Sequence, residues 1–296
     1  MKILSLDGGG IRGIFQIEVL RELERQCGIL KDIDIFAGSS TGAIISMGLA
    51  CGKSIDELAE KYYCLGSYIF SRRERFKSII NPFSSRYSSW RLREALFDMF
   101  EDGEICKVPY EFMITTKCAY TNRIEEIHHN KHKYAGWLIV DALMAATAAP
   151  TFFPPVEIEN TFYIDGGVGC NNPAWRAAAY AEKQFGNYVN RIKIISIGTC
   201  SSFYSKRPGK YRRLDKMRWG KTVIDMLMDD SSKESTERCK KRYGRNFIRV
   251  DSSSRTGSNI GLDCYERARA ELPALARLAV DKIIAEGKVK DWINSN

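Results

Sequence analysis

Apolar and polar residues follow two alternating patterns along the chain. Short runs rich in Ile, Leu, Val and Phe have the length of buried strands, while longer stretches repeat their apolar residues every three or four positions, as amphipathic helices do. Strands are predicted at residues 2–6, 33–37, 161–164 and 191–197, with an antiparallel hairpin at 111–116 and 123–127. Helices are predicted at residues 13–26, 43–51, 138–146, 173–185, 222–228 and 265–287. Strands that alternate with helices predict a three-layer α/β fold with a central, mostly parallel sheet flanked by helices.

The pattern gives no sign of a second domain. The chain has 296 residues, and it contains no internal repeat and no proline-rich linker. We therefore expect a single domain over residues 1–296, with the catalytic motifs within residues 1–200 and with basic loops and C-terminal helices over residues 201–296. The hydrophobic content of 44% is enough for a large core and excludes a disordered or low-complexity protein.

The sequence also bears on the compartment of the protein. No apolar stretch approaches the roughly 20 residues of a membrane-spanning helix, and the apolar run at the N-terminus is too short for a signal peptide. The nine cysteines include no Cys-x-x-Cys pair, which disfavours a zinc ribbon or a thioredoxin-type site. We therefore expect a cytoplasmic protein whose thiols are reduced.

Positive charge is concentrated in two segments of the chain. Lys and Arg number 45 against 36 Asp and Glu, a formal net charge of +9. Residues 71–93 contain seven basic residues and one acidic residue, interleaved with aromatic side chains, and residues 206–221 contain eight and one. Such a mixture predicts that residues 71–93 form a cap that contacts an anionic membrane surface. The alternative is an ordinary solvated surface with the aromatic side chains folded beneath it.

A glycine-rich turn follows the first predicted strand and opens the first predicted helix. It contains Gly-x-Gly-x-x-Gly at Gly8, Gly10 and Gly13, the spacing of a dinucleotide-binding turn. The same run of glycines lets backbone N–H groups converge on any negatively charged oxygen, including the oxyanion of an acyl transfer. The dinucleotide interpretation expects an acidic residue at the end of the second strand, which is absent. A tight turn without a ligand is the third interpretation.

A second small-residue turn follows the second predicted strand. Residues 38–42 read Gly-Ser-Ser-Thr-Gly, which fits the Gly-x-Ser-x-Gly nucleophile elbow in its strand-turn-helix context. Gly38 and Gly42 supply the small neighbours that so sharp a turn requires, and Ser40 is the candidate nucleophile.

A serine nucleophile needs a base, and the sequence offers two candidates. The three histidines, His128, His129 and His132, lie in one polar stretch that we interpret as a solvated loop, which disfavours a Ser-His-Asp triad. Asp165 ends a predicted strand and precedes Gly166 and Gly167, as an ordinary turn residue also would. A carboxylate within hydrogen-bond reach of Ser40 can accept its proton, especially where burial raises the pKa of the carboxyl group.

The three turns, in this order, resemble the patatin-like phospholipase family. Its motifs are Asp-Gly-Gly-Gly-x-Arg/Lys-Gly, then Gly-x-Ser-x-Gly, then Asp-Gly-Gly or Asp-Gly-Ala. The matching segments are residues 7–13, 38–42, 148–150, 165–167 and 171–173. The resemblance covers at least residues 1–200, and it departs at Cys200, where glycine is more usual.

The resemblance implies an oxyanion hole formed by the backbone of Gly8, Gly9 and Gly10, with no metal and no cofactor. Gly38, Gly42 and Gly166 are implied as supporting residues of the turns. Arg12 is implied either to neutralise charge near the oxyanion hole or to anchor the following helix.

The resemblance further implies a lipid acyl hydrolase of the phospholipase A type that cleaves fatty-acyl esters of membrane phospholipids. In this enzyme Ser40 attacks the ester carbonyl, and Asp165 acts as the general base and later activates water. The expected location is the cytoplasm, with peripheral attachment to an anionic membrane when the enzyme is active. No nucleic acid is expected as a partner.

Two other functions stay open at this point. Some bacterial patatin-like proteins look like anti-phage defence effectors that are inactive until a cyclic oligonucleotide binds, so a cyclic-nucleotide activator is one candidate partner. The other alternative is a non-enzymatic nucleotide-binding module that uses the turn at residues 8–13. A homo-oligomer also stays open.

Overall fold

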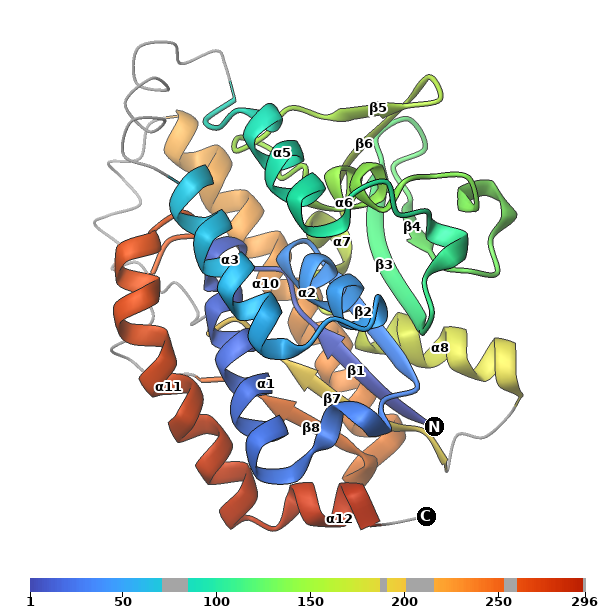
Figure 1. Ribbon diagram of the computed structural model, residues 1–296, viewed down its shortest axis with the longest axis vertical. Helices are drawn as coiled ribbons and strands as arrows, with labels where there is room; N and C mark the ends of the chain where they lie inside the picture. Colours follow the sequence, from blue (N-terminus) through green and yellow to red (C-terminus); the bar gives the residue numbers. More distant parts are fainter. Residues whose placement is uncertain (71–84, 187–190, 201–215, 253–259, 295–296) are drawn as a thin grey trace.

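One mixed sheet lies at the centre of the computed structural model (Figure 1). The structure describes residues 1–70, 85–186, 191–200, 216–252 and 260–294. Within these residues the sheet has eight strands, in the order β5-β6-β3-β2-β1-β7-β8, and β4 pairs with β3. The strands are β1 (Lys2–Leu6), β2 (Ile35–Ser39), β3 (Glu111–Cys118), β4 (Ile124–Ile127), β5 (Val156–Ile158), β6 (Thr161–Asp165), β7 (Lys193–Ile197) and β8 (Phe247–Val250).

The register of the sheet brings the three small-residue turns to one edge. β3, β2, β1, β7 and β8 are parallel to one another, and the antiparallel strands β4, β6 and β5 extend the sheet beyond β3. Leu6 pairs with Gly38 at the ends of β1 and β2, so the turns that follow these two strands are neighbours. Thr116 of β3 pairs with Asp165 at the end of β6, which adds the third turn to the same edge.

Helices cover both faces of the sheet, which confirms the predicted three-layer α/β fold (Figure 1). They are α1 (Gly13–Cys27), α2 (Thr41–Ala50), α3 (Ile55–Ile69), α5 (Ser89–Phe100), α6 (Ile139–Thr147), α7 (Gly167–Cys170), α8 (Ala174–Phe185), α10 (Lys216–Tyr243), α11 (Tyr265–Ala285) and α12 (Lys288–Asn294). In the described part of the chain, no helix is both long enough and apolar enough to cross a membrane.

Alternate residues of the central strands separate two hydrophobic cores. Leu4 of β1 and Phe36 of β2 pack with α1, α2, α3, α6 and α11 in the larger core. Ile3 and Ile35, one position earlier on each strand, pack with α8 and the end of α10 in the smaller one. Both faces of the parallel strands are therefore buried, as is usual for parallel sheets.

Helix α10 is much longer than the sequence pattern predicts. The apolar spacing indicates a helix only at residues 222–228, but the helix continues to Tyr243. Its second half is rich in charged and hydroxyl residues, so no apolar stripe marks it. The side facing the sheet uses small hydroxyl residues instead, and Ser232, Ser235 and Thr236 are all buried.

The two basic segments are only partly described by the structure. Residues 71–84 and 206–215 lie outside the described residues, so the prediction of a membrane-contacting cap stays a prediction. Tyr87 is buried beside Phe70, and Arg86 forms an ion pair with Asp263, with 2.9 Å between the charged atoms. Trp90, at the start of α5, is 62% exposed.

Candidate active site

Ser40 occupies a sharp turn between β2 and α2. Its backbone has φ 51° and ψ −122°, in a region that side chains other than glycine rarely adopt. A Cβ atom at Gly38 would lie 2.2 Å from the carbonyl oxygen of Gly42, and one at Gly42 would lie 2.2 Å from the carbonyl oxygen of Leu6. Glycine is therefore required on both sides of Ser40, and the turn presents the serine side chain at the N-terminus of α2.

Asp165 lies directly against this serine. Ser40 Oγ donates a hydrogen bond of 2.6 Å to Oδ2 of Asp165, and the backbone N–H of Gly167 donates one of 2.7 Å to Oδ1. Both side chains are buried, with Asp165 only 1% exposed. Burial raises the pKa of Asp165 from 3.8 to about 6, although the hydrogen bonds from Ser40 and Gly167 oppose the rise. A carboxylate with this pKa can accept the serine proton at neutral pH.

Gly166 also occupies a position where only glycine fits. A Cβ atom there would lie 2.4 Å from the carbonyl oxygen of Thr115 in β3. The close approach of the two backbones lets the chain turn directly after Asp165 and places the N–H of Gly167 beneath the carboxylate.

An apolar pocket opens over Ser40 and Asp165. It is lined mainly by aliphatic and aromatic side chains from α2, α3, α10 and the residues after α6. These include Ile44, Leu65, Ile69, Phe152, Phe153, Ile224 and Met228. No histidine is among the described residues that line it, and Asp165 is the lining residue with a carboxylate. The pocket suits an uncharged, elongated group such as an acyl chain.

The first glycine turn borders the same pocket. The N–H of Gly8 donates a 3.0 Å hydrogen bond to the carbonyl of Asn171, so this group holds the turn in place rather than facing the pocket. The N–H groups of Gly9 and Gly10 make no hydrogen bond to a described residue, and Gly10 lines the pocket. Of the three glycines predicted to form an oxyanion hole, Gly9 and Gly10 thus keep an N–H group without a hydrogen-bond partner among the described residues.

Both of these glycines are required by their surroundings. A Cβ atom at Gly9 would lie 2.4 Å from Oγ1 of Thr199, and one at Gly10, where φ is +55°, would lie 2.4 Å from the carbonyl oxygen of Leu262. Arg12 reaches back to the same turn, and its Nε donates to the carbonyl of Gly9 at 3.3 Å. Because the N–H of Gly10 belongs to the same peptide plane as that carbonyl, Arg12 fixes the direction in which the N–H points.

An ion-pair network below this turn is not indicated by any sequence motif. Arg249 of β8 makes two hydrogen bonds to Asp7, of 2.8 and 2.7 Å, and a third of 2.8 Å to Asp251. Ser232 of α10 also donates to Asp7, at 2.9 Å. Asp251 accepts the N–H of Cys200, whose φ of 58° is the conformation that glycine favours. The sequence signal for this network is Arg249 itself, a charged residue among the apolar residues of β8.

The three histidines differ in how well they match the prediction of a solvated loop, which holds for the exposed His132. The expectation of a solvated loop is wrong for His128, which is 6% exposed and packs against Tyr180 in a tilted arrangement with 4.4 Å between ring centroids. Nε2 of His129 lies 2.7 Å from the carbonyl oxygen of Val108. His132 lies in a short 3-10 helix. The aromatic side chain of Phe112 and the ring of Tyr180 supply the apolar surface that covers the first two.

The chain is similar to a known protein family and to several known proteins. The family model of patatin-like phospholipases matches residues 4–178. A cGAMP-activated phospholipase of Vibrio cholerae is 27% identical over 310 residues, which cover 89% of this chain and 85% of the relative. A cGAMP-activated phospholipase of Escherichia coli is 30% identical over 243 residues, covering 74% of this chain and 67% of the relative. The crystal structure of VipD from Legionella pneumophila superposes with a TM-score of 0.47 at 13% identity, covering 95% of this chain and 66% of that chain.

Proposed function

The chain belongs to the patatin-like phospholipase family, and we propose that it hydrolyses fatty-acyl esters of phospholipids through Ser40 and Asp165. The observation that carries this proposal is the 2.6 Å hydrogen bond between the serine hydroxyl and a buried carboxylate. Its position at the base of an apolar pocket supports an acyl group as the substrate.

In the proposed reaction, Ser40 Oγ attacks the ester carbonyl carbon while Oδ2 of Asp165 accepts the hydroxyl proton. The carbonyl oxygen becomes an oxyanion, and the N–H groups of Gly9 and Gly10 stabilise it. The tetrahedral intermediate then breaks its bond to the leaving alcohol, which takes the proton back from Asp165. In the second half of the reaction Asp165 removes a proton from water, and the resulting attack on the acyl-serine releases the fatty acid and restores the hydroxyl of Ser40.

The pocket supports a lipid rather than a small polar ester. Its walls above the serine are aliphatic and aromatic, and such a surface gains free energy when it covers an alkyl chain instead of water. A phospholipid presents its ester at the boundary between chain and headgroup, so a protein that hydrolyses it has to meet a membrane surface. We therefore include peripheral membrane binding and a cytoplasmic location in the proposal.

Labelling with a fluorophosphonate, followed by mapping of the modified residue, tests the nucleophile. Modification at Ser40 is expected, with complete loss of labelling in Ser40→Ala. Ser39→Ala is a matched control, because the neighbouring hydroxyl is buried and has no hydrogen-bond partner among the described residues. Labelling that survives in Ser40→Ala would contradict the proposal.

Gating by a cyclic nucleotide is a second part of the proposed function. It is supported by the relatives, several of which are named cGAMP-activated or cUMP-AMP-activated phospholipases. The test compares vesicle hydrolysis by the purified protein with and without a cyclic dinucleotide. Hydrolysis at the same rate in both conditions would remove gating and leave the hydrolase.

We also propose that residues 1–296 form a single patatin-like domain. The segment beyond the matched residues supports this, because β8 extends the central sheet beside β7 and α11 packs along α1 in the larger core.

A further inference from the structure

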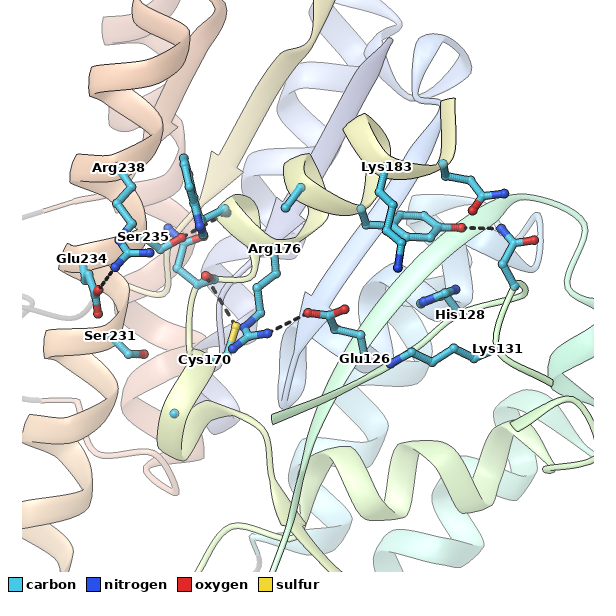
Figure 2. Close-up of a pocket in the computed structure, with 17 residues that line it drawn as sticks. Glu126, His128, Lys131, Cys170, Arg176, Lys183, Ser231, Glu234, Ser235 and Arg238 are labelled. Atoms are coloured by element: carbon cyan, nitrogen blue, oxygen red, sulfur yellow. Dashed lines mark hydrogen bonds and ion pairs between the residues drawn. The ribbon is translucent and has the colours of Figure 1, made fainter. Parts of the chain in front are cut away.

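A second, larger cavity lies away from the pocket over Ser40, and the two share no lining residue. It has a volume of about 620 Å3 and lies between α8, α10, α7 and the residues that follow β4. Figure 2 shows Lys183, His128 and Lys131 on one side of it, Arg176 and Glu126 near its centre, and Glu234, Ser235 and Arg238 of α10 on the other side. Its volume falls in the range of sites for small molecules and cofactors.

The charges around this cavity favour an anion. Arg176 pairs with Glu126 at 2.7 Å, and Arg238 pairs with Glu234 at 2.6 Å, so these four charges cancel. Lys131 and Lys183 make no ion pair with a described carboxylate. The ammonium group of Lys131 lies 5.9 Å from the ring centroid of Tyr134. Two positive charges without a carboxylate partner are therefore left at one end of the cavity.

A buried polar atom at the same end also lacks a partner. Nδ1 of His128 is inaccessible to solvent and makes no hydrogen bond within the described residues, although the side chain lines the cavity. Burial lowers the pKa of His128 to about 4, so the ring is neutral near pH 7 and can donate from one nitrogen and accept at the other. Because Nδ1 is inaccessible even to water, it faces the protein rather than the open cavity, and His128 adds a neutral ring edge to this end of the lining.

The opposite end of the cavity offers an aromatic surface. The indole of Trp175 lines it, and the guanidinium of Arg238 lies 5.6 Å from the indole ring centroid. Aromatic and guanidinium planes are the groups on which unpaired nucleobases commonly stack. We propose that this cavity binds a nucleotide, with its phosphate at Lys131 and Lys183 and its base beside Trp175.

The cavity is connected to the dyad by two short paths. Helix α10 borders both sites, since Met228 lines the pocket over the serine and Ser231 lines this cavity one turn later. Helix α7 begins with Gly167, which bonds Asp165, and ends at Cys170, which lines the cavity. Asn171 joins the two helices, because its N–H donates to Ser231 Oγ at 2.8 Å.

Occupation of the cavity can therefore change the dyad. A ligand that binds more tightly to one arrangement of α7 and α10 shifts the protein towards that arrangement and moves the support of Asp165 with it. The regulatory part of this inference rests on the proposed hydrolase function, whereas the binding part does not.

The binding part is tested by calorimetry on the full chain with cyclic GMP-AMP, AMP and inorganic phosphate as probes. Lys131→Ala/Lys183→Ala should weaken binding of the nucleotide probes by at least about tenfold. The control Lys31→Ala/Lys290→Ala removes the same charge from two exposed lysines remote from the cavity and should leave affinity unchanged. Equal affinity in the cavity variant, or no binding of either nucleotide to the wild type at millimolar concentration, overturns the site. Binding of phosphate as tight as that of the nucleotides overturns the role of the base.

The regulatory part is tested on the same proteins with a phospholipid vesicle assay. Cyclic GMP-AMP should raise hydrolysis by the wild type at least about tenfold, and the rise should be lost in Lys131→Ala/Lys183→Ala while its basal rate stays unchanged. A full rise in that variant overturns the regulatory role of this cavity. Nucleotide binding without any hydrolysis contradicts the proposed function instead and leaves the binding site standing.

Discussion

Asp165→Asn should abolish hydrolysis and at the same time stabilise the folded protein. The carboxylate that we propose as the proton acceptor for Ser40 is buried, and burial is the reason why its pKa rises from 3.8 to about 6. An amide of the same shape can still accept the N–H of Gly167 and can donate to Ser40 Oγ, but it cannot accept a proton. It also removes the cost of keeping a buried charge.

The size of the gain follows from the pKa shift. A shift of about two units, at about 1.4 kcal/mol per unit, is worth roughly 3 kcal/mol once the group is ionised in the folded protein. Because its folded-state pKa is raised, the contribution of Asp165 to stability is fully present below pH 3.8 and is lost as the pH rises through about 6. The difference in unfolding free energy between Asp165→Asn and the wild type should therefore be small at pH 4 and full at pH 7 and above.

The assay is thermal or urea unfolding of the wild type, Asp165→Asn and Ser40→Ala from pH 4 to pH 8. Ser40→Ala is the matched control, because it is equally inactive but keeps the carboxylate and should keep its pH-dependent loss of stability. In parallel, kcat/KM of the wild type on a short soluble ester should fall below pH 6, about tenfold per pH unit, as the base becomes protonated. Equal stability of Asp165→Asn and wild type at pH 8, or a pH-independent rate between pH 5 and 7, would refute this reasoning.

Three further variants test the rest of the site. Ser40→Ala should eliminate hydrolysis with an unchanged circular dichroism spectrum, and residual activity above a few per cent would contradict a serine nucleophile. Gly9→Ala should lower kcat by about 10²-fold or more, because a Cβ atom crowds the oxyanion turn; Gly136→Ala, where a Cβ meets nothing within 4 Å, should have little effect on the same steady-state measurement. Arg249→Met should lower the free energy of unfolding in urea by about 3–5 kcal/mol, because it leaves Asp7 buried without its partner. Recovery of stability in Asp7→Asn/Arg249→Met would support this cause, whereas a neutral Arg249→Met would exclude it.

The three turns could be predicted from the sequence because each demands particular residue types. No side chain fits at Gly38, Gly42 or Gly166 without meeting a backbone oxygen within 2.4 Å, so the chain keeps glycine there, visibly in the sequence. The order of strands and helices then predicts a parallel sheet, and strand register brings Ser40 and Asp165 to one edge. Local sequence patterns and the predicted order of strands are therefore enough to predict that Ser40 and Asp165 lie close together.

Features that depend on contacts between distant segments could not be predicted in this way. The second half of α10 is polar on all sides in sequence, and only the hydroxyl residues Ser231, Ser232 and Ser235 reveal which side faces the rest of the fold. Arg249 lies 242 residues from Asp7, and no spacing rule joins them. His128 was expected in solvent because its neighbours are polar, yet its ring is covered by Tyr180 from α8.

Helix α10 takes part in several contacts between distant segments. Helix α10 donates through Ser232 to Asp7 below the oxyanion turn, accepts through Ser231 from Asn171 at the end of α7, and lines both cavities. The two turns proposed to hold the oxyanion and the base are therefore joined to one helix that lies outside the matched family segment at residues 4–178. Because Ser231 and Ser232 join α10 to these turns through hydrogen bonds, a shift of α10 would change the support of both turns. This makes α10 the element through which a ligand in the second cavity would act on the serine.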